Sequence, residues 1–263
     1  MTVLPKAAAG FTLVEMIIVI VLTGIIGGMV AMFIRAPVQG YADSARRADM
    51  TDVADTALQR IVRDLRGALP NSVRVSGGHT IDFLVTSGGG RYRAAAGGTN
   101  DVLDFSAADA SFEVIGSVPA LAAGDQIVVY NLGIPGADAY LNDNRASFAS
   151  QAGKVVSFSA AKKFPFESPQ QRFQVVREQV RYICDPVTGN LMRYWGFPIS
   201  TPADAVPASG GSALLASHVS DCSFTYDSNL VAQRSGLVTL KLSLSEGGES
   251  VTLYSATHVS NVP

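Results

Sequence analysis

The chain begins with a short segment that contains Lys6 and continues into a long apolar run. No charged side chain occurs in residues 16–34. At about 1.5 Å per residue in a helix, this run reaches about 28 Å, close to the thickness of the hydrocarbon core of a bilayer. The pattern predicts one membrane-spanning helix. A cleaved secretory signal and a buried core helix are the alternatives that apolar character alone leaves open.

The helical pattern continues beyond the apolar run. Asp and Arg alternate on the polar faces, which is typical of a helix laid against a domain, although salt bridges between subunits remain an alternative. Pro37 predicts a kink near the membrane exit, because its ring clashes with the preceding turn, and Pro70 ends the pattern. We expect one helix over residues 11–69, with residues 11–34 in the membrane. The apolar stripe comprises Tyr41, Ala45, Ala48, Ala54, Leu58, Ile61, Leu65 and Leu69.

After Pro70 the pattern changes to short β-branched and aromatic runs separated by Gly, Pro, Asn and Asp, which is typical of strands. Loops are expected at 87–100, 135–151 and 201–212, and a hairpin turn at 185–190. The predicted fold class is α+β, with a long N-terminal helix packed on an antiparallel β-rich head over residues 70–263. The predicted strands are residues 73–75, 80–86, 102–105, 112–115, 126–131, 153–158, 173–184, 190–197, 219–226, 237–245 and 250–255.

One carboxylate, Glu15, lies at the start of the apolar region. A carboxylate inside a membrane segment costs about 2.5 to 3.5 kcal/mol on insertion scales and marks a functional partner. Glu15 therefore needs a cation. A conventional secretory signal fits this segment poorly, because its hydrophobic region is shorter, carries no acid and ends near a small-residue cleavage site.

The stretch GFTLVEMIIVIV, which starts at Gly10, resembles the class III signal of type IV prepilins and type II secretion pseudopilins. The resemblance implies that a prepilin peptidase removes the leader, residues 1–10, by cutting between Gly10 and Phe11, and methylates the new amine of Phe11. That ammonium would lie one helical turn from Glu15. It would neutralise the carboxylate of its own subunit or of a neighbour during assembly.

A more specific resemblance covers most of the chain. The stretches ALPNSVRV, VRYICDPVTGNLMRYWGF and SATHVSNVP occur in an order similar to that of MshO-type minor pilins of mannose-sensitive haemagglutinin pili. The same order of segments also resembles that of the J-type pseudopilins of type II secretion and of PilW-type minor pilins. Major subunits of the family are shorter, which implies a minor subunit.

This resemblance implies a structural subunit, not an enzyme, that helps initiate or cap a type IV pilus. The implied location is the bacterial inner membrane, with one pass and the head in the periplasm, and later the filament. The implied partners are prepilin peptidase, other major and minor pilins, the inner-membrane assembly platform and membrane lipid along residues 11–34. A type II secretion pseudopilin, a DNA-uptake pseudopilin and a plain membrane-anchored periplasmic domain stay open as alternatives.

Charge and cysteine content limit which partners, metal sites and disulfides are expected. The formal net charge of -2 supplies no polycationic surface, so nucleic acid is not an expected partner. Cys184 and Cys222 are too few for a cysteine zinc site. In an oxidising compartment they are a candidate disulfide, and two separately buried thiols are the alternative.

No catalytic or metal motif is evident. His79, His218 and His258 are scattered, without the spacing of a zinc-binding helix, and no nucleophile elbow or phosphate-binding loop occurs. We therefore expect no catalytic residue, no metal and no cofactor. The loop 138–144, which contains Asp138 and Asn144, is a candidate calcium loop, although the turn preferences of Asp and Asn explain it more simply.

Overall fold

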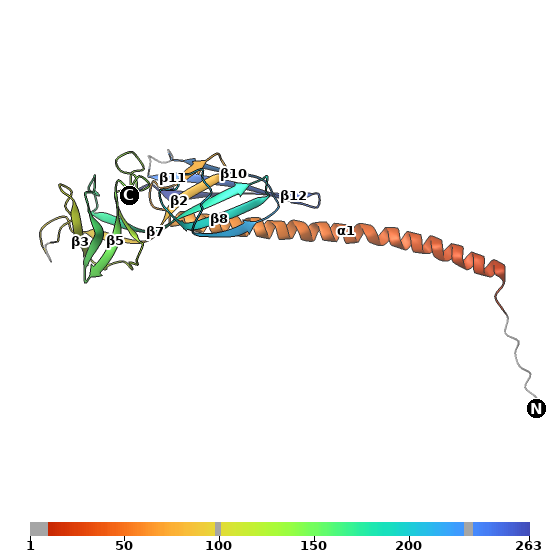
Figure 1. Cartoon of the computed structure of the whole chain (residues 1–263). Coiled ribbons are helices and arrows are strands. Elements are labelled where there is room, and N and C mark those ends of the chain that lie inside the picture. Colours follow the sequence, from red (N-terminus) through yellow and green to blue (C-terminus); the bar gives the residue numbers. More distant parts are fainter. Residues whose placement is uncertain (1–9, 98–100, 229–233) are drawn as a thin grey trace, which may run out of the picture. The chain divides into compact units, whose positions relative to one another are not determined.

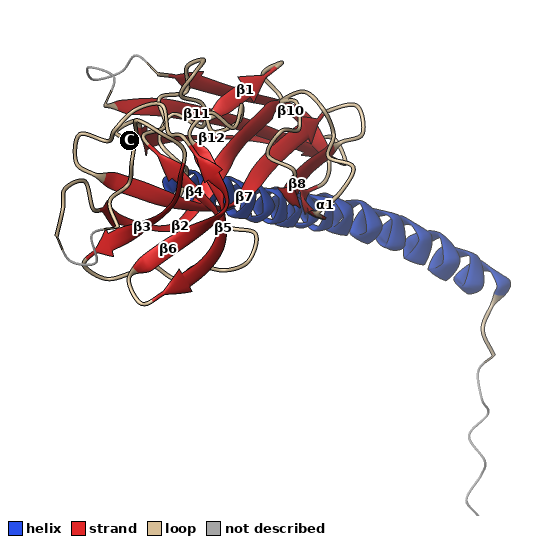
Figure 2. Cartoon of the chain, turned by 60° about the vertical axis from the view of Figure 1, so that its left-hand side comes forward, coloured by secondary structure: helices blue, strands red, loops and turns tan. Residues whose placement is uncertain are grey.

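The computed structural model describes residues 10–97, 101–228 and 234–263, and the chain forms two compact units, Met1–Asp49 and Met50–Pro263. Helix α1 (Leu13–Arg66), the blue ribbon in Figure 2, contributes to both units. Pro37 lies inside this helix. The predicted end at residue 69 is wrong by three residues. Gly67 N–H and Ala68 N–H donate to the carbonyls of Asp64 and Leu65, so the chain tightens into a turn after Arg66.

The first unit is an apolar helix with its side chains exposed. The helix is long and apolar enough to cross a membrane, and its most apolar window has a mean hydropathy of 2.8. Met32 and Phe33 are 78% and 84% exposed within the chain. Such a helix needs lipid or other protein chains around it, because exposing this much apolar surface to water is unfavourable.

The second unit is a β-rich head in which every strand pairing is antiparallel. The strands are β1 (Arg74–Ser76), β2 (Thr80–Tyr92), β3 (Asp109–Ile115), β4 (Gln126–Val129), β5 (Arg145–Ala152), β6 (Val155–Lys162), β7 (Arg172–Asp185), β8 (Asn190–Phe197), β9 (Gly211–Ala216), β10 (Val219–Asp227), β11 (Ser235–Glu246) and β12 (Glu249–Ser260). The predicted antiparallel β-rich head is therefore confirmed.

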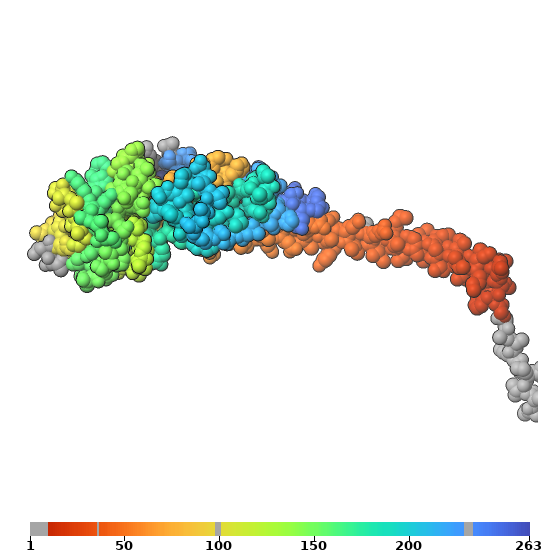
Figure 3. All heavy atoms as spheres, in the orientation of Figure 1, coloured from red at the N-terminus to blue at the C-terminus, as the bar shows by residue number. Residues whose placement is uncertain are grey.

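Strands β2 and β7 run side by side through two lobes of the head, which are seen next to each other in Figures 1 and 3. In one lobe the pairing order β2-β3-β6-β5-β4-β7 returns to β2, so these strands close into a barrel. The barrel core is aromatic, with Phe112 packed edge-on against Phe173 at 5.0 Å between ring centroids. Closure leaves these strands with few free edges.

In the other lobe, the remaining length of β2 and β7 forms a sheet with β1, β8 and β9, opposite a second sheet of β10, β11 and β12. Helix α1 contributes Ala54, Ile61 and Leu65 to the core between them. The predicted stripe is therefore buried from Ala54 onward. Its first three members, Tyr41, Ala45 and Ala48, are exposed, because they precede the part of the helix that packs on the head.

Strand prediction failed where local sequence and tertiary role disagree. Residues 102–105 form no strand, although Leu103 is buried in the barrel. All of strand β5 except Ala152 falls in the predicted loop 135–151, and no strand was predicted where β9 lies. The Gly-rich stretch 88–90 is not a loop but part of β2. A Cβ on Gly89 would lie 2.7 Å from the carbonyl oxygen of Phe173, so glycine allows β2 and β7 to approach.

Two predicted local features are present in the head. The turn 185–190 connects β7 to β8, with Gly189 at a φ of 71° and the Asp185 carboxylate accepting hydrogen bonds from Val187 N–H and the Thr188 hydroxyl. Cys184 and Cys222 form a disulfide, with Cα atoms 6.5 Å apart, which joins β7 to β10. The disulfide therefore links the two sheets that enclose the α1 core.

Candidate functional site: the N-terminal segment and the buried charges of the head

The N-terminal site begins at a capped helix end. Thr12 precedes α1, and its hydroxyl accepts a hydrogen bond from Glu15 N–H at 3.3 Å. The first helical backbone bond runs from Met16 N–H to the Thr12 carbonyl at 3.2 Å. Thr at the N-cap with Glu three residues later is the sequence of a capping box. The spacing T-x-x-E in the sequence indicates this cap, but sequence analysis did not predict a cap at Thr12.

Phe11 and Glu15 lie on either side of this cap. Phe11 is 79% exposed, and no heavy atom lies within 4 Å of a Cβ built on Gly10. Glu15 occupies the first turn, where a carboxylate interacts favourably with the positive end of the helix dipole. The remainder of the predicted leader, residues 1–9, lies outside the described residues. The peptide bond after Gly10 is thus next to an exposed side chain, one residue before the helix cap.

Within the unit Met50–Pro263, the end of α1 is tied to the head by a largely buried charge cluster around Asp64. Its Oδ2 atom accepts hydrogen bonds from the Tyr182 hydroxyl at 2.6 Å and from Arg193 Nε at 2.8 Å. Arg60 Nε lies 3.3 Å from the other carboxylate oxygen. Burial, and then the hydrogen bond to Asp64, raise the pKa of Tyr182. Sequence analysis placed the charged residues of this helix, Asp64 among them, on a solvated face or in salt bridges between subunits, and missed this role.

A second buried carboxylate, Asp82, organises the adjacent sheet. Asp82 accepts hydrogen bonds from Arg181 Nη2 at 2.8 Å, Gln179 Nε2 at 2.6 Å and Arg74 Nη2 at 2.8 Å. Arg181 is fully buried and also donates to the carbonyl of Ala205. The cluster therefore holds the loop after β8 against the sheet. Its carboxylate is fully engaged with structural partners, which suits a role in stability rather than in proton transfer.

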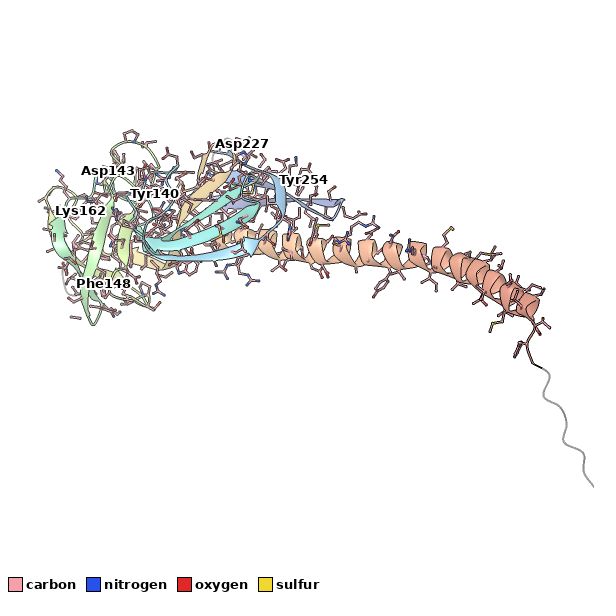
Figure 4. All side chains as sticks on the ribbon, turned by 45° about the vertical axis from the view of Figure 1, so that its right-hand side comes forward. Tyr140, Asp143, Phe148, Lys162, Asp227 and Tyr254 are labelled. Atoms are coloured by element: carbon pink, nitrogen blue, oxygen red, sulfur yellow. A yellow bond between two sulfur atoms is a disulfide. The ribbon has the colours of Figure 1, made fainter. Side chains whose placement is uncertain are left out.

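The candidate calcium loop 138–144 uses its carboxylates to hold its own backbone. Asp143 Oδ2 accepts hydrogen bonds from Gly136 N–H and Asp138 N–H, and Asp138 Oδ1 accepts one from Tyr140 N–H. Tyr140 and Asp143 are labelled in Figure 4. Among the described residues, no group of three His, Cys, Asp or Glu side chains is placed to hold a metal ion. His79 lies instead beside the disulfide, with Nδ1 3.5 Å from Cys222 Sγ.

Comparison with known proteins bears on the N-terminal segment. A family model described as the prokaryotic N-terminal methylation motif matches residues 5–33, a segment that includes Gly10, Phe11 and Glu15. No curated protein and no solved structure matches the chain. The matched motif, one apolar helix and a β-rich antiparallel domain with a Cys184–Cys222 disulfide together support a type IV pilin-like protein, processed as a prepilin and anchored in a membrane by a single pass.

Proposed function

We propose that the protein is a minor pilin or pseudopilin, a structural subunit that helps initiate or cap assembly of a type IV pilus. One observation carries the proposal: the methylation motif coincides with a helix that starts at a Thr12 cap and carries Glu15 in its first turn. Cleavage after Gly10 would create an ammonium on Phe11 close to this carboxylate. The pair supplies an anion and a cation for contacts between subunits in a low-dielectric environment.

The finer parts of the proposal rest on the resemblance described above. They are an MshO-type role in mannose-sensitive haemagglutinin pili, a head in the periplasm, a non-enzymatic function without cofactor, and partnership with other pilins and the assembly platform. A J-like type II secretion pseudopilin, a DNA-uptake pseudopilin and a plain membrane-anchored periplasmic domain are the competing functions. The large head, with two lobes, is compatible with a minor subunit that presents more surface to its neighbours than a short one.

The first test is the mass of the mature N-terminus after co-expression with an active prepilin peptidase. We expect a chain that starts at N-methylated Phe11 and whose processing is blocked by Gly10→Val. An intact leader beside a processed control prepilin would refute the proposal and favour a plain membrane anchor.

A second test separates processing from assembly. Glu15→Gln keeps the size of the side chain but removes its charge, so we expect normal processing with loss of the protein from sheared filaments. The matched control is Asp204→Asn, which removes an exposed carboxylate from the head. Equal recovery of Glu15→Gln and Asp204→Asn in filaments would contradict the assigned role of Glu15.

A further inference from the structure

A pocket lies where the barrel lobe of the head meets the other lobe. It has a volume of about 540 Å³ and is lined by residues of β4, β5, β7 and β8 and of the loop 198–210, which connects β8 to β9. Strands β4 and β5 belong to the barrel, whereas β8 and the loop belong to the other lobe (Figure 1). The volume is that of a site for a small molecule.

Arg145, the first residue of β5, contributes a cation without a partner to this pocket. Its neighbour Ala146 is buried in the barrel core, so the alternation of side chains along the strand directs Arg145 to the outer face of the barrel. Its Nε atom is buried without a hydrogen bond, and within the described part of the chain no carboxylate pairs with its guanidinium. Burial lowers the pKa of Arg145, and no nearby carboxylate opposes that shift. A partly buried guanidinium in this state needs an acceptor.

A second arginine, Arg177 on β7, lines the same pocket but has a carboxylate of its own. Its Nε lies 3.3 Å from Asp125 Oδ1, and Asp125 Oδ2 accepts a hydrogen bond from Ala122 N–H at 2.8 Å. Asp125 is buried, and both of its oxygens are engaged by these contacts. The Arg177 side chain is 52% exposed, so the outer end of its guanidinium is accessible to a ligand that Arg145 holds.

The lining of the pocket also includes one carboxylate, Glu178. Glu178 lines a neighbouring pocket as well, together with Arg60 and Arg193. These two arginines share the single carboxylate of Asp64, which leaves one positive charge there to offset Glu178. The uncompensated charge of the first pocket is therefore that of Arg145, which favours an anionic ligand.

The loop 198–210 gives the pocket an apolar part near Arg145. Pro198 is exposed, and Ile199 packs against a cluster that contains Val128, the residue paired with Arg145 between β4 and β5. The loop is held in place from within the head, because buried Arg181 donates hydrogen bonds to two of its backbone carbonyls, those of Thr201 and Ala205. The pocket is thus already formed without a ligand, which lowers the cost of binding.

We propose that this pocket binds a small organic anion, with its carboxylate or phosphate group on the Arg145 guanidinium and its apolar part against Pro198 and Ile199. A guanidinium binds either group with two parallel hydrogen bonds. The ligand contacts the barrel through Arg145 and the other lobe through the loop 198–210, so its binding stabilises the head as a whole. The site is separate from the N-terminal segment, and its occupancy does not depend on processing.

Calorimetric titration of the full-length protein in detergent, in a buffer free of phosphate and carboxylates, tests the binding. Two matched pairs of probes are used: inorganic phosphate with phenyl phosphate, and acetate with benzoate. We expect saturable binding of at least one of the aromatic anions, about tenfold tighter than that of its small counterpart, because the ring buries apolar area. The pair that binds more tightly identifies the preferred anionic group. Absence of saturable binding by both aromatic anions, or no gain over the small ions, would overturn the proposal.

Arg145→Met separates binding from a structural role, because it removes the cation and keeps a long unbranched side chain. We expect the affinity for the tighter probe to fall about tenfold or more. The urea midpoint without a ligand should not fall, since the variant loses a charge that has no partner in the fold. The matched control is Arg91→Met, which changes an exposed arginine on β2 in the barrel lobe and should bind the probe as wild type does.

The urea midpoint is then measured with and without the probe. The probe should raise the midpoint of wild type and Arg91→Met and leave that of Arg145→Met unchanged. An equal rise in all three proteins would be a general effect of the salt on burial, and it would overturn the proposal. A lower midpoint of Arg145→Met without the probe, combined with an unchanged affinity, would assign Arg145 to the fold instead and would also overturn it.

Discussion

The Tyr182 hydroxyl donates a 2.6 Å hydrogen bond to Asp64 Oδ2, which connects the central strand β7 to the last turn of α1. Arg193 on β8 binds the same oxygen at 2.8 Å. A membrane-anchored helix can hold a head in place only if the two are joined firmly. This cluster and the apolar stripe from Ala54 to Leu65 provide that junction within the head unit.

Removing the carboxylate at this junction should destabilise the head strongly. Asp64→Ala leaves the Arg193 guanidinium and the Tyr182 hydroxyl buried without their partner, so we expect a loss of about 3 kcal/mol in the free energy of unfolding. Tyr182→Phe removes one hydrogen bond and should cost about 1 kcal/mol. Urea unfolding of the full-length protein in detergent, followed by fluorescence of the single tryptophan, Trp195, measures both.

The control for these substitutions is Glu167→Ala, which removes an exposed carboxylate from a loop of the head. It should change the free energy of unfolding by less than about 0.5 kcal/mol. If Asp64→Ala were as mild as Glu167→Ala, the cluster would not hold helix and sheet together.

Head stability should fall at alkaline pH. The pKa of Tyr182 is raised above its ordinary value of 10.0 by burial and by the hydrogen bond to Asp64. The unfolded chain therefore releases this proton at a lower pH than the native chain. Stability contributed by the tyrosine is complete below about pH 10 and is lost as the pH rises toward the native pKa.

The urea midpoint measured at increasing pH, starting near neutrality, checks this prediction. Burial also raises the pKa of Tyr92 and Tyr226, so Tyr182→Phe should make the decline shallower without abolishing it. Tyr254→Phe, which changes a ring that is 69% exposed, should leave the slope unaltered. An identical slope in wild type and Tyr182→Phe would be evidence against this linkage.

The disulfide should contribute strongly to stability. Cys184 and Cys222 are separated by 38 positions, for which the chain-entropy model gives about 4 kcal/mol. The double variant Cys184→Ser/Cys222→Ser should therefore unfold at a clearly lower urea concentration. Wild type unfolded in the presence of a reductant should match it. An unchanged midpoint would show that the link between the two sheets adds nothing to the packing around α1.

The close approach of β2 to β7 depends on glycine. Gly89→Ala would place a Cβ 2.7 Å from the Phe173 carbonyl oxygen, and relief of that clash requires a backbone shift that should cost about 1 to 3 kcal/mol. Gly67→Ala is the matched control, because its Cβ would meet its nearest atom at an ordinary 3.5 Å. Equal midpoints for the two variants would mean that the strands can separate at this point without loss.

Local sequence predicted much of the chain because the responsible interactions are local. The apolar run, the carboxylate at Glu15 and the Pro at position 70 all act within a few turns of their own helix. The hairpin 185–190 is specified by Asp185 and Gly189 within the turn itself. The loop predicted at 88–90 was wrong, because glycine usually marks a loop. Here glycine allows β2 to pair closely with a strand more than eighty residues away in sequence.

The sequence by itself determined the N-terminal site, since Gly10, Phe11, Thr12 and Glu15 are neighbours along the chain and their relation needs only a helix start. Tertiary structure decided the barrel closure of β2 on β7 and the partners of Asp64 and Asp82. The physical reason is separation along the chain: Asp64 and Tyr182 are 118 residues apart, and only the completed fold brings a buried carboxylate and its donors together.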